Sequence, residues 1–184
     1  TYKPVTDGNI EPCRELCNEL MQYQKEAAVK DKERFDAMNF DTRMKSSYLT
    51  SMLNHVVIAY DGENPIGYVY STIDIVPEEA RDYKPSWAGS GDGFYPAWVK
   101  LPQKIGCLSN LYVKSEYRRS GVGKALMEYA MKWLESFDDV KTVFVYISNG
   151  NEKNVMDFYR SYVFKYSHDV FDGFITACYK KLEK

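Results

Sequence analysis

The stretch from Ile105 to Ile147 restricts the possible folds of this chain more than any other part of its sequence. Residues 105–113 are predicted to form a strand, and a turn with two glycines follows it. Residues 120–137 repeat apolar side chains every three or four positions, which is the spacing of an amphipathic helix. Residues 143–147 form a continuous apolar run, as expected of a strand covered on both faces. Together these lengths predict two parallel strands joined by a right-handed crossover.

The remaining segments add strands and helices to this unit. Asp61-Gly62 and Asn64-Pro65 are strong turn residues between two β-rich runs, so residues 55–60 and 66–73 are predicted to form a hairpin. The other predicted elements are a strand at 2–5, helices at 10–28 and 32–53 with a break near 39–41, a helix at 151–162, and strands at 164–170 and 174–182. The sequence thus predicts an α/β fold, with a central mixed sheet and helices on both faces, in a single domain over residues 1–184.

Composition argues against several classes of protein. The net charge of −2 argues against a general affinity for nucleic acid. No apolar run reaches the roughly 18 residues of a membrane-spanning helix. The four cysteines stand at positions 13, 17, 107 and 178, and only two histidines accompany them, so a metal site is not expected. Free thiols in a cytoplasmic protein are the preferred interpretation, because disulfides belong mainly to oxidising compartments.

Residues 76–104 are too rich in proline and glycine for one regular element. A loop of this length in a compact domain usually has a function or is mobile. It carries Trp87, Phe94, Tyr95 and Trp98, aromatic side chains that are costly to leave wholly in water. Two interpretations stand: the loop is a lid or the wall of a substrate pocket, or it is a structural flap over the core.

The turn that precedes the amphipathic helix has the chemistry of an anion-binding site. Gly121 and Gly123 lack a β-carbon, so the backbone can turn tightly and approach a bound group closely. The first amides of the helix have no partner within it, and the helix dipole adds partial positive charge there. Full positive charges come from Arg118, Arg119 and Lys124. The turn therefore suits a pyrophosphate, although its spacing matches neither the nucleotide P-loop nor the complete dinucleotide pattern.

Two neighbouring motifs resemble the coenzyme A signature of the GNAT superfamily of N-acetyltransferases. They are Leu111-Tyr112-Val113 and Arg118-Arg119-Ser120-Gly121-Val122-Gly123. The family pattern is Leu-x-Val, four spacer residues, Arg/Gln-x-x-Gly-x-Gly/Ala and then a helix. The order of predicted elements agrees over nearly the whole chain. The resemblance implies the GNAT-type acyl-CoA N-acyltransferase fold, and acetyl-CoA as the cofactor.

The resemblance also implies roles for individual residues. Backbone groups of Leu111 and Val113 would pair with the pantetheine arm, in a gap where the two parallel strands splay apart. The pyrophosphate would lie on a turn made of Arg118, Arg119, Ser120, Gly121, Val122, Gly123 and Lys124. Asn151 resembles an asparagine that often contacts the cofactor. Phe158-Tyr159, followed by Phe164, resembles the family's Phe-Tyr-x-x-x-Gly-Phe segment.

The implied reaction is direct attack of a primary amine on the acetyl thioester in a ternary complex. An alkylammonium has a pKa of roughly 10.4, so a group must take its proton. A backbone amide of the splayed strand can stabilise the developing oxyanion. Tyr159 is the candidate general acid, because a phenol is protonated at neutral pH and can donate to the leaving thiolate. The alternative for Tyr159 is a packing role beside Val155 and Tyr162.

The general base is not identified by the sequence. Cys107 stands where many relatives have a base glutamate. A water relay, a carboxylate such as Asp74 or Glu79, and an acceptor that arrives neutral are the open alternatives. His55 and His168 are interpreted as ordinary strand residues.

Two further positions depart from the family pattern. Asn151 lies eight residues before Tyr159 instead of the usual seven. This spacing indicates either a bulge of one residue or an asparagine that is only a helix cap. Val163 replaces the glycine before Phe164, which is expected to strain or reshape that turn.

The leading hypothesis is an acetyl-CoA-dependent N-acetyltransferase that acts on a small-molecule amine. A peptide or protein amine is the runner-up, since the 76–104 loop can narrow the cleft or open. A non-catalytic acyl-CoA sensor and a pure interaction module are the other hypotheses, and the resemblance adds a homodimer as an expectation. A cationic amine could be attracted by acidic residues that otherwise form a solvated face, namely Glu26, Asp31, Glu33 and Asp36.

Overall fold

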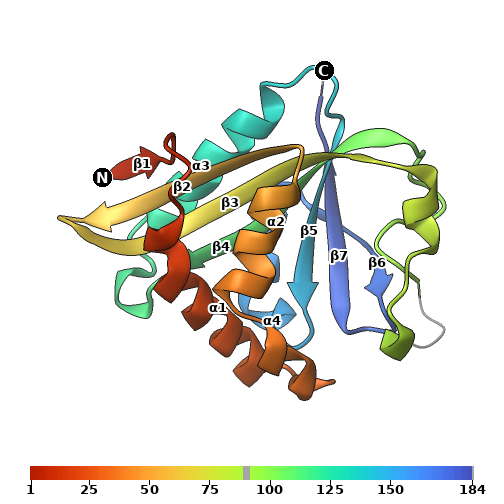
Figure 1. The fold of residues 1–184 in the computed structure, drawn as a ribbon, viewed down its shortest axis with the longest axis horizontal. Helices are drawn as coiled ribbons and strands as arrows, with labels where there is room; N and C mark the ends of the chain where they lie inside the picture. Colours follow the sequence, from red (N-terminus) through yellow and green to blue (C-terminus); the bar gives the residue numbers. More distant parts are fainter. Residues whose placement is uncertain (89–91, 184) are drawn as a thin grey trace.

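A mixed sheet with helices on both faces forms the centre of the molecule (Figure 1). The computed structural model describes residues 1–88 and 92–183. Within these ranges the strands are β1 (Tyr2–Pro4), β2 (Leu53–Asp61), β3 (Asn64–Val76), β4 (Gln103–Val113), β5 (Thr142–Ser148), β6 (Lys165–Val170) and β7 (Ile175–Lys181). The α-helices there are α1 (Arg14–Ala27), α2 (Ser46–Thr50), α3 (Val122–Glu135) and α4 (Glu152–Ser161). The predicted α/β fold is confirmed.

The two faces of the sheet contribute to different cores, because successive side chains of a strand point to opposite sides. Val56 and Ile58 of β2 pack with α1 and with the helical turn η3 (Phe40–Lys45). Val57 and Ala59 pack instead with α3 and α4. This alternation fixes the register of the hairpin β2–β3, in which Asp61 pairs with Asn64 around a turn at Gly62.

The parallel pair predicted from the sequence is β4 and β5, and it is short. Its ladder joins Gly106 to Val143, Cys107 to Phe144, and Leu108 to Val145. The other neighbouring strands in the described part of the sheet pair antiparallel. Figure 1 shows β5 turning away from β4 beyond the paired residues. Residues 109–113 of β4 therefore present an open edge toward β5.

The interrupted helical stretch predicted at 32–53 is wrong in its details. The segment contains the 3₁₀ turn η2 (Lys32–Ala37), the π-helical turn η3 and α2, and Leu53 already belongs to β2. The break falls at the predicted place, because Asn39 is extended and caps η3. Its side chain accepts a hydrogen bond from the Thr42 amide, and the Thr42 hydroxyl accepts one from the Asn39 amide.

The 76–104 segment contains two short 3₁₀ turns, η4 (Glu78–Asp82) and η5 (Ser86–Ala88), before β4 begins. One part of it packs on the sheet, and another part lines a pocket. Tyr95 and Trp98 lie on Phe144 and Tyr179 at the sheet, with ring centroids between 4.7 and 6.0 Å apart, and so form a flap. Trp87 and Phe94 line a pocket that is described below. The glycines at 89 and 91 lie outside the described residues.

Two observations concern the whole described chain. None of its helices has the length and apolar character needed to cross a membrane. The four cysteines are free thiols, as predicted. Cys13 and Cys17, at the start of α1, are both buried.

Candidate functional site

The early end of the β4–β5 ladder opens the sheet at its centre. Beyond Leu108 and Val145 the two strands no longer pair, although β4 continues to Val113 and β5 to Ser148. The register between β3 and β4 shifts at the same place, so that Tyr70 pairs with Asn110 while Ser71 pairs with Leu108. This bulge bends β4 where the gap begins. Backbone groups of an extended ligand can pair with the open edge, as a further strand would.

The glycine turn follows β4 and begins α3. Gly121 has φ +88° and is the N-cap residue, a conformation that glycine adopts without strain. The first intrahelical bond runs from the Ala125 amide to the Gly121 carbonyl. Among the described residues, the amides of Val122, Gly123 and Lys124 have no protein acceptor. A β-carbon on Gly123 would come no closer than 3.9 Å to Phe158 and Val113, so there is space in front of these amides. The arrangement fits a phosphate group.

A cleft of about 370 Å³ lies between β4, α1 and α4, and we call it the α4 cleft. It brings together most of the residues predicted for cofactor binding and catalysis, namely Leu111, Val113, Arg118, Arg119, Gly123, Asn151 and Tyr159. The other predicted residues do not line it but belong to the adjoining turn, namely Ser120, Gly121, Val122 and Lys124. The Ser120 hydroxyl donates to the Tyr117 carbonyl and so stiffens that turn.

The first helix supplies a wall of the α4 cleft that the sequence did not reveal. Leu20 and Tyr23 of α1 line it, together with Tyr112 of β4. The Arg118 guanidinium lies over the rings of Tyr23 and Tyr112, 5.1 and 5.5 Å from their centroids, and its Nε donates to the Val113 carbonyl at 2.9 Å. Arg118 is therefore held at the mouth of the cleft. The spacing of apolar residues places Leu20 and Tyr23 on the buried face of a helix, but it does not show which strand that face contacts.

Asn151 is the N-cap residue of α4, yet its side chain does not cap the helix backbone. Its Oδ1 accepts a hydrogen bond from Asn154 Nδ2 at 3.1 Å, and its side chain is buried beside the cleft. Asn151 follows directly after a tight turn at Gly150, which has φ +81°. A β-carbon there would lie 1.9 Å from the Ala27 carbonyl oxygen, so only glycine fits against the end of α1.

Asn149, just before this turn, ties α1 to the sheet. Its Oδ1 accepts hydrogen bonds from the amides of Val29 and Lys30 at 2.9 and 2.7 Å. Its Nδ2 donates to the carbonyls of Lys30 and Phe174 at 3.0 and 3.1 Å. These four bonds fix the C-terminal end of α1, which carries Tyr23 toward the cleft.

Tyr159 lies on the buried face of α4, where it lines the α4 cleft. Only 8% of the residue is exposed, and its ring packs against Phe158 and Phe164 at 5.5 and 6.0 Å. Burial raises the pKa of its phenol well above the usual value, with smaller contributions from Cys107 and Cys178. The phenol thus keeps its proton at neutral pH.

A second pocket, of about 250 Å³, continues from the gap on the other side, and we call it the aromatic pocket. Six aromatic side chains line it: Phe35, Trp87, Phe94, Tyr146, Phe171 and Phe174. Its other lining residues are Gln24, Met38, Arg43, Ser47, Cys107, Leu108, Ser109, Asn110, Ser148 and Ile175. Asn110 and Leu111 are consecutive on β4 and line the aromatic pocket and the α4 cleft respectively, so both spaces border β4 at the same place.

No carboxylate or histidine lines the aromatic pocket among the described residues. Asp74 accepts a hydrogen bond from the Met52 amide at 2.8 Å, and Glu79 is exposed on η4. Cys107 does line the pocket, but burial raises the pKa of its thiol to about 11 despite a lowering contribution from Ser109. Cys107 is therefore a neutral thiol at neutral pH.

The two histidines lie on strands, as predicted, and neither lines the α4 cleft or the aromatic pocket. His55 stacks on Trp133 of α3, with ring centroids 5.1 Å apart. His168 of β6 is buried, and its Nε2 lies 2.8 Å from the Gly93 carbonyl.

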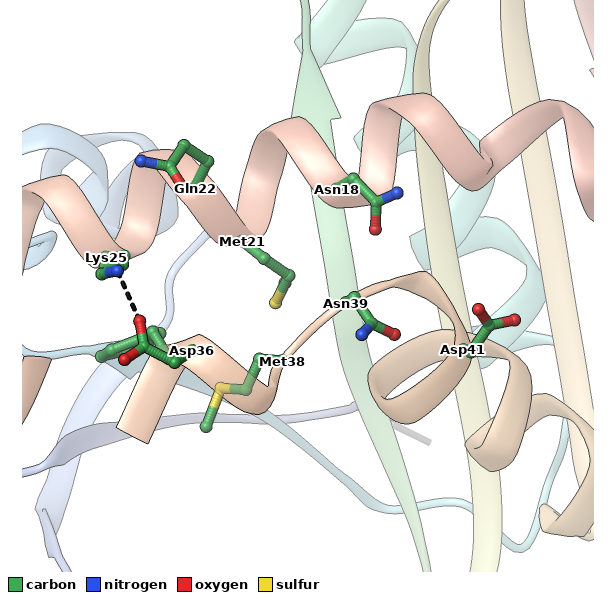
Figure 2. A pocket seen from close by; sticks show the side chains of 9 residues that line it. Asn18, Met21, Gln22, Lys25, Asp36, Met38, Asn39 and Asp41 are labelled. Carbon is green, nitrogen blue, oxygen red and sulfur yellow. Dashed lines mark ion pairs between the residues drawn. The ribbon is translucent and has the colours of Figure 1, made fainter. Parts of the chain in front are cut away.

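An open groove of about 360 Å³ lies outside the aromatic pocket, between α1 and the segment from η2 to η3 (Figure 2). Phe35 and Met38 line both spaces and so separate them. Figure 2 shows the ion pair of Lys25 with Asp36 across one end of this outer groove. Asp41, at its other end, pairs with Arg14 at 2.9 Å. Both acidic residues of the groove are thus already neutralised.

A protein-family model gives the decisive comparison. The model described as "Acetyltransferase (GNAT) family" matches residues 14–162, which include α1, the open gap, the glycine turn and α4. The chain belongs to the GNAT family. No curated protein sequence matches this GNAT chain.

Solved structures share the fold of this GNAT chain at low sequence identity. The PaiA N-acetyltransferase of Thermoplasma acidophilum, solved with coenzyme A, has a TM-score of 0.63 at 15% identity, with 99% of each chain covered. The smu.2055 protein of Streptococcus mutans UA159 has a TM-score of 0.61 at 16% identity, with 100% and 99% covered. Arabidopsis thaliana NAA60, solved with acetyl-CoA, has a TM-score of 0.57 at 13% identity, with 99% and 97% covered. The predicted GNAT fold is confirmed.

Proposed function

We propose that this GNAT chain forms one catalytic domain that transfers the acetyl group of acetyl-CoA to a primary amine of a small molecule. The observation that carries the proposal is that two spaces border β4 at the β4–β5 gap. The α4 cleft leads to the glycine turn, and the aromatic pocket approaches Asn110 from the other side. An acyl donor and an amine can therefore meet in a ternary complex, which favours direct attack.

The proposed cofactor residues fall into two groups by their chemistry. The unpartnered amides of Val122, Gly123 and Lys124 would bind the pyrophosphate, with Arg118 and Arg119 supplying positive charge. The open edge of β4 between Leu111 and Val113, with Asn151 opposite, would bind the pantetheine arm. Coenzyme A or acetyl-CoA is bound in two of the similar structures, which supports this assignment.

Tyr159 is the proposed hydrogen-bond donor to the leaving sulfur. The bound acetyl-CoA supplies an activated thioester. A thiol has a pKa of about 8.5, which lies below that of a buried phenol. Tyr159 therefore stabilises the leaving sulfur by donating a hydrogen bond, and the last proton comes from the amine once its nitrogen is acylated. The backbone amides at the open edge of β4 would stabilise the oxyanion.

The amine is proposed to lose its proton without a carboxylate of the enzyme. The described lining of the aromatic pocket contains neither a carboxylate nor a histidine, and Cys107 holds its proton. Water or the bulk buffer would then accept the proton, or the acceptor would bind in its neutral form. A neutral form is favoured in this pocket because burial among aromatic rings disfavours charge.

The size of the aromatic pocket favours a small molecule over a peptide. Its volume of about 250 Å³ lies just below the roughly 300–1,000 Å³ that is usual for small-molecule sites. A peptide would have to continue past Phe35 and Met38 into the outer groove. A panel of amines and peptides decides between the two acceptor classes: turnover confined to peptides would exclude the small-molecule assignment.

Calorimetry with acetyl-CoA and coenzyme A tests the cofactor site directly. We expect micromolar binding that Gly121→Glu weakens by at least about tenfold, because it brings a carboxylate to the proposed pyrophosphate site. Gly8→Glu is the matched control: Gly8 also has positive φ, +76°, and an added β-carbon would have nothing within 4 Å, as at Gly121. Equal binding by both variants, or none by the folded wild type, would exclude the proposed site.

A further inference from the structure

The aromatic pocket has an uneven distribution of charge. Arg43 is the one charged side chain in its described lining. The aromatic rings contact one another at their edges, as between Trp87 and Phe174 at 5.1 Å and between Phe94 and Phe171 at 4.8 Å. They form a rigid apolar wall that suits a flat or apolar molecule. A ligand of this pocket thus meets apolar surface over most of its area and a single cation.

Arg43 is held by a rigid support, yet its charge is not neutralised. It lies on η3, whose Phe40 and Met44 are wholly buried and whose first turn is closed by a capping box. Its guanidinium makes no hydrogen bond or ion pair with the described residues. The nearest acidic residues in sequence are engaged elsewhere, since Asp41 pairs with Arg14 and Asp36 with Lys25. An exposed cation without a partner at a pocket wall is available to an anionic ligand.

The lining of the aromatic pocket also contains unsatisfied polar atoms. Asn110 Oδ1 and Ser148 Oγ are buried and have no hydrogen-bond partner among the described residues. Both residues are 6% exposed, and both line the pocket at the open end of the β4–β5 gap. Buried polar atoms normally find a partner, and both oxygens can accept from the N–H groups of an amine. The amine end of a ligand is therefore expected beside Asn110.

We infer that the acceptor is a monoamine with an aromatic or apolar body and an anionic group that binds Arg43. The inference rests on the proposed function and assigns its substrate class. Arg43 acts as the specificity residue, because a second cationic group in place of the anion would be repelled by it. Polyamines are thereby excluded as good acceptors.

Three phenethylamines that carry an anionic, a neutral or a cationic substituent at the same position test the inference. Their para substituents are carboxylate, methyl and aminomethyl, and kcat/KM is measured with saturating acetyl-CoA. The wild type is expected to prefer the carboxylate over the methyl compound by about tenfold to a hundredfold, which is the usual contribution of a charged hydrogen bond. Arg43→Gln should bring the two within about threefold, and Arg43→Glu should favour the aminomethyl compound. Lys45→Gln, which removes a neighbouring cation of η3 that does not line the pocket, should leave the preference unchanged.

A binding measurement separates this inference from the proposed function. Calorimetry of 4-ethylbenzoate against the coenzyme A complex needs no turnover, and we expect Arg43→Gln to weaken binding by about tenfold or more. If 4-ethylbenzoate binds through Arg43 while none of the amines is acetylated, the pocket assignment stands and the proposed function fails. If the wild type acetylates the three amines equally, or prefers the aminomethyl compound, the inference is overturned while amine acetylation stands. Undetectable binding of 4-ethylbenzoate to the wild type also overturns it.

Discussion

Substitution of Val163 by glycine is expected to stabilise the protein, although it removes a side chain. Val163 follows the C-terminus of α4 and has φ +69°, in the left-handed region that β-branched residues rarely adopt. The turn is nevertheless closed, since the Val163 amide donates to Arg160 at 2.9 Å and the Phe164 amide to Tyr159 at 3.2 Å. Glycine is the usual residue at such a helix end.

The expected change in the free energy of unfolding is the sum of three contributions. Relief of the left-handed strain contributes about 2 kcal/mol for a β-branched residue. The greater flexibility of glycine in the unfolded chain costs about 0.7 kcal/mol. Val163 is 61% exposed, so its lost contacts cost only about 0.5 kcal/mol. The net gain is about 1 kcal/mol, which corresponds to a rise in Tm of about 2–4 °C for a chain of this length.

Thermal and urea unfolding of Val163→Gly measure this gain, and Val29→Gly is the matched control. Val29 is also highly exposed, at 83%, but it is not among the described residues with positive φ. The same substitution there should lower the stability by about 0.5–1 kcal/mol. A Tm for Val163→Gly at or below that of the wild type would refute the reasoning, because it would mean that the turn stores no strain.

Four further outcomes are expected. Asn149→Ala should lower the free energy of unfolding by about 2 kcal/mol in urea titrations, because it removes the four hydrogen bonds that hold the end of α1. As a control, Asn18→Ala removes one hydrogen bond from the Phe40 amide and should lower the free energy of unfolding by less than half as much. Tyr159→Phe should lower kcat by about a hundredfold while the KM for acetyl-CoA stays within about threefold, and an unchanged kcat would remove Tyr159 from the mechanism. The acidic limb of the pH profile of kcat/KM should move with the pKa of the acceptor amine, so a limb fixed across acceptors would reveal an enzyme base. Burial raises the pKa values of the Cys107 and Cys178 thiols from 9.0 to about 11, so the folded state binds these protons more tightly than the unfolded state. Their contribution to the free energy of unfolding should be fully present below about pH 9 and should fall as the pH rises toward 11. A urea midpoint that stays constant over that range would contradict this.

Local sequence patterns predicted much of the fold and one side of the candidate site. The glycine turn could be predicted because its chemistry lies in consecutive residues, from Arg118 to Lys124. The parallel pair followed from the lengths of three consecutive elements. The helix at 32–53 could not be resolved into its turns, because an extended residue between two short helical turns produces the same average apolar spacing as one irregular helix. Only the Asn39-Phe40-Asp41 segment indicated the break.

The aromatic pocket could not be predicted, because its lining comes from segments that are far apart in the chain. Gln24, Arg43 and Ser148 lie on α1, η3 and β5, and no sequence spacing connects them. A weak signal existed in the aromatic residues that flank the Asp172-Gly173 turn, and in those of the 76–104 loop. Aromatic residues in turns are as often packed as they are functional, so this signal indicated burial without indicating a pocket. Of the acidic residues expected either to attract a cationic amine or to form a solvated face, Asp36 lies in the outer groove and pairs with Lys25.

Helix α1 lines both the α4 cleft and the aromatic pocket. Its last turns place Tyr23 in the α4 cleft and Gln24 in the aromatic pocket, although the two are neighbours in the sequence. The same helix end is tied by Asn149 to the turn that carries Asn151, and thus to α4. A rigid connection of this kind fixes the separation between a bound thioester and a bound amine, which is what direct attack requires of the protein. Loosening it should therefore impair the reaction more than it impairs the binding of either substrate alone.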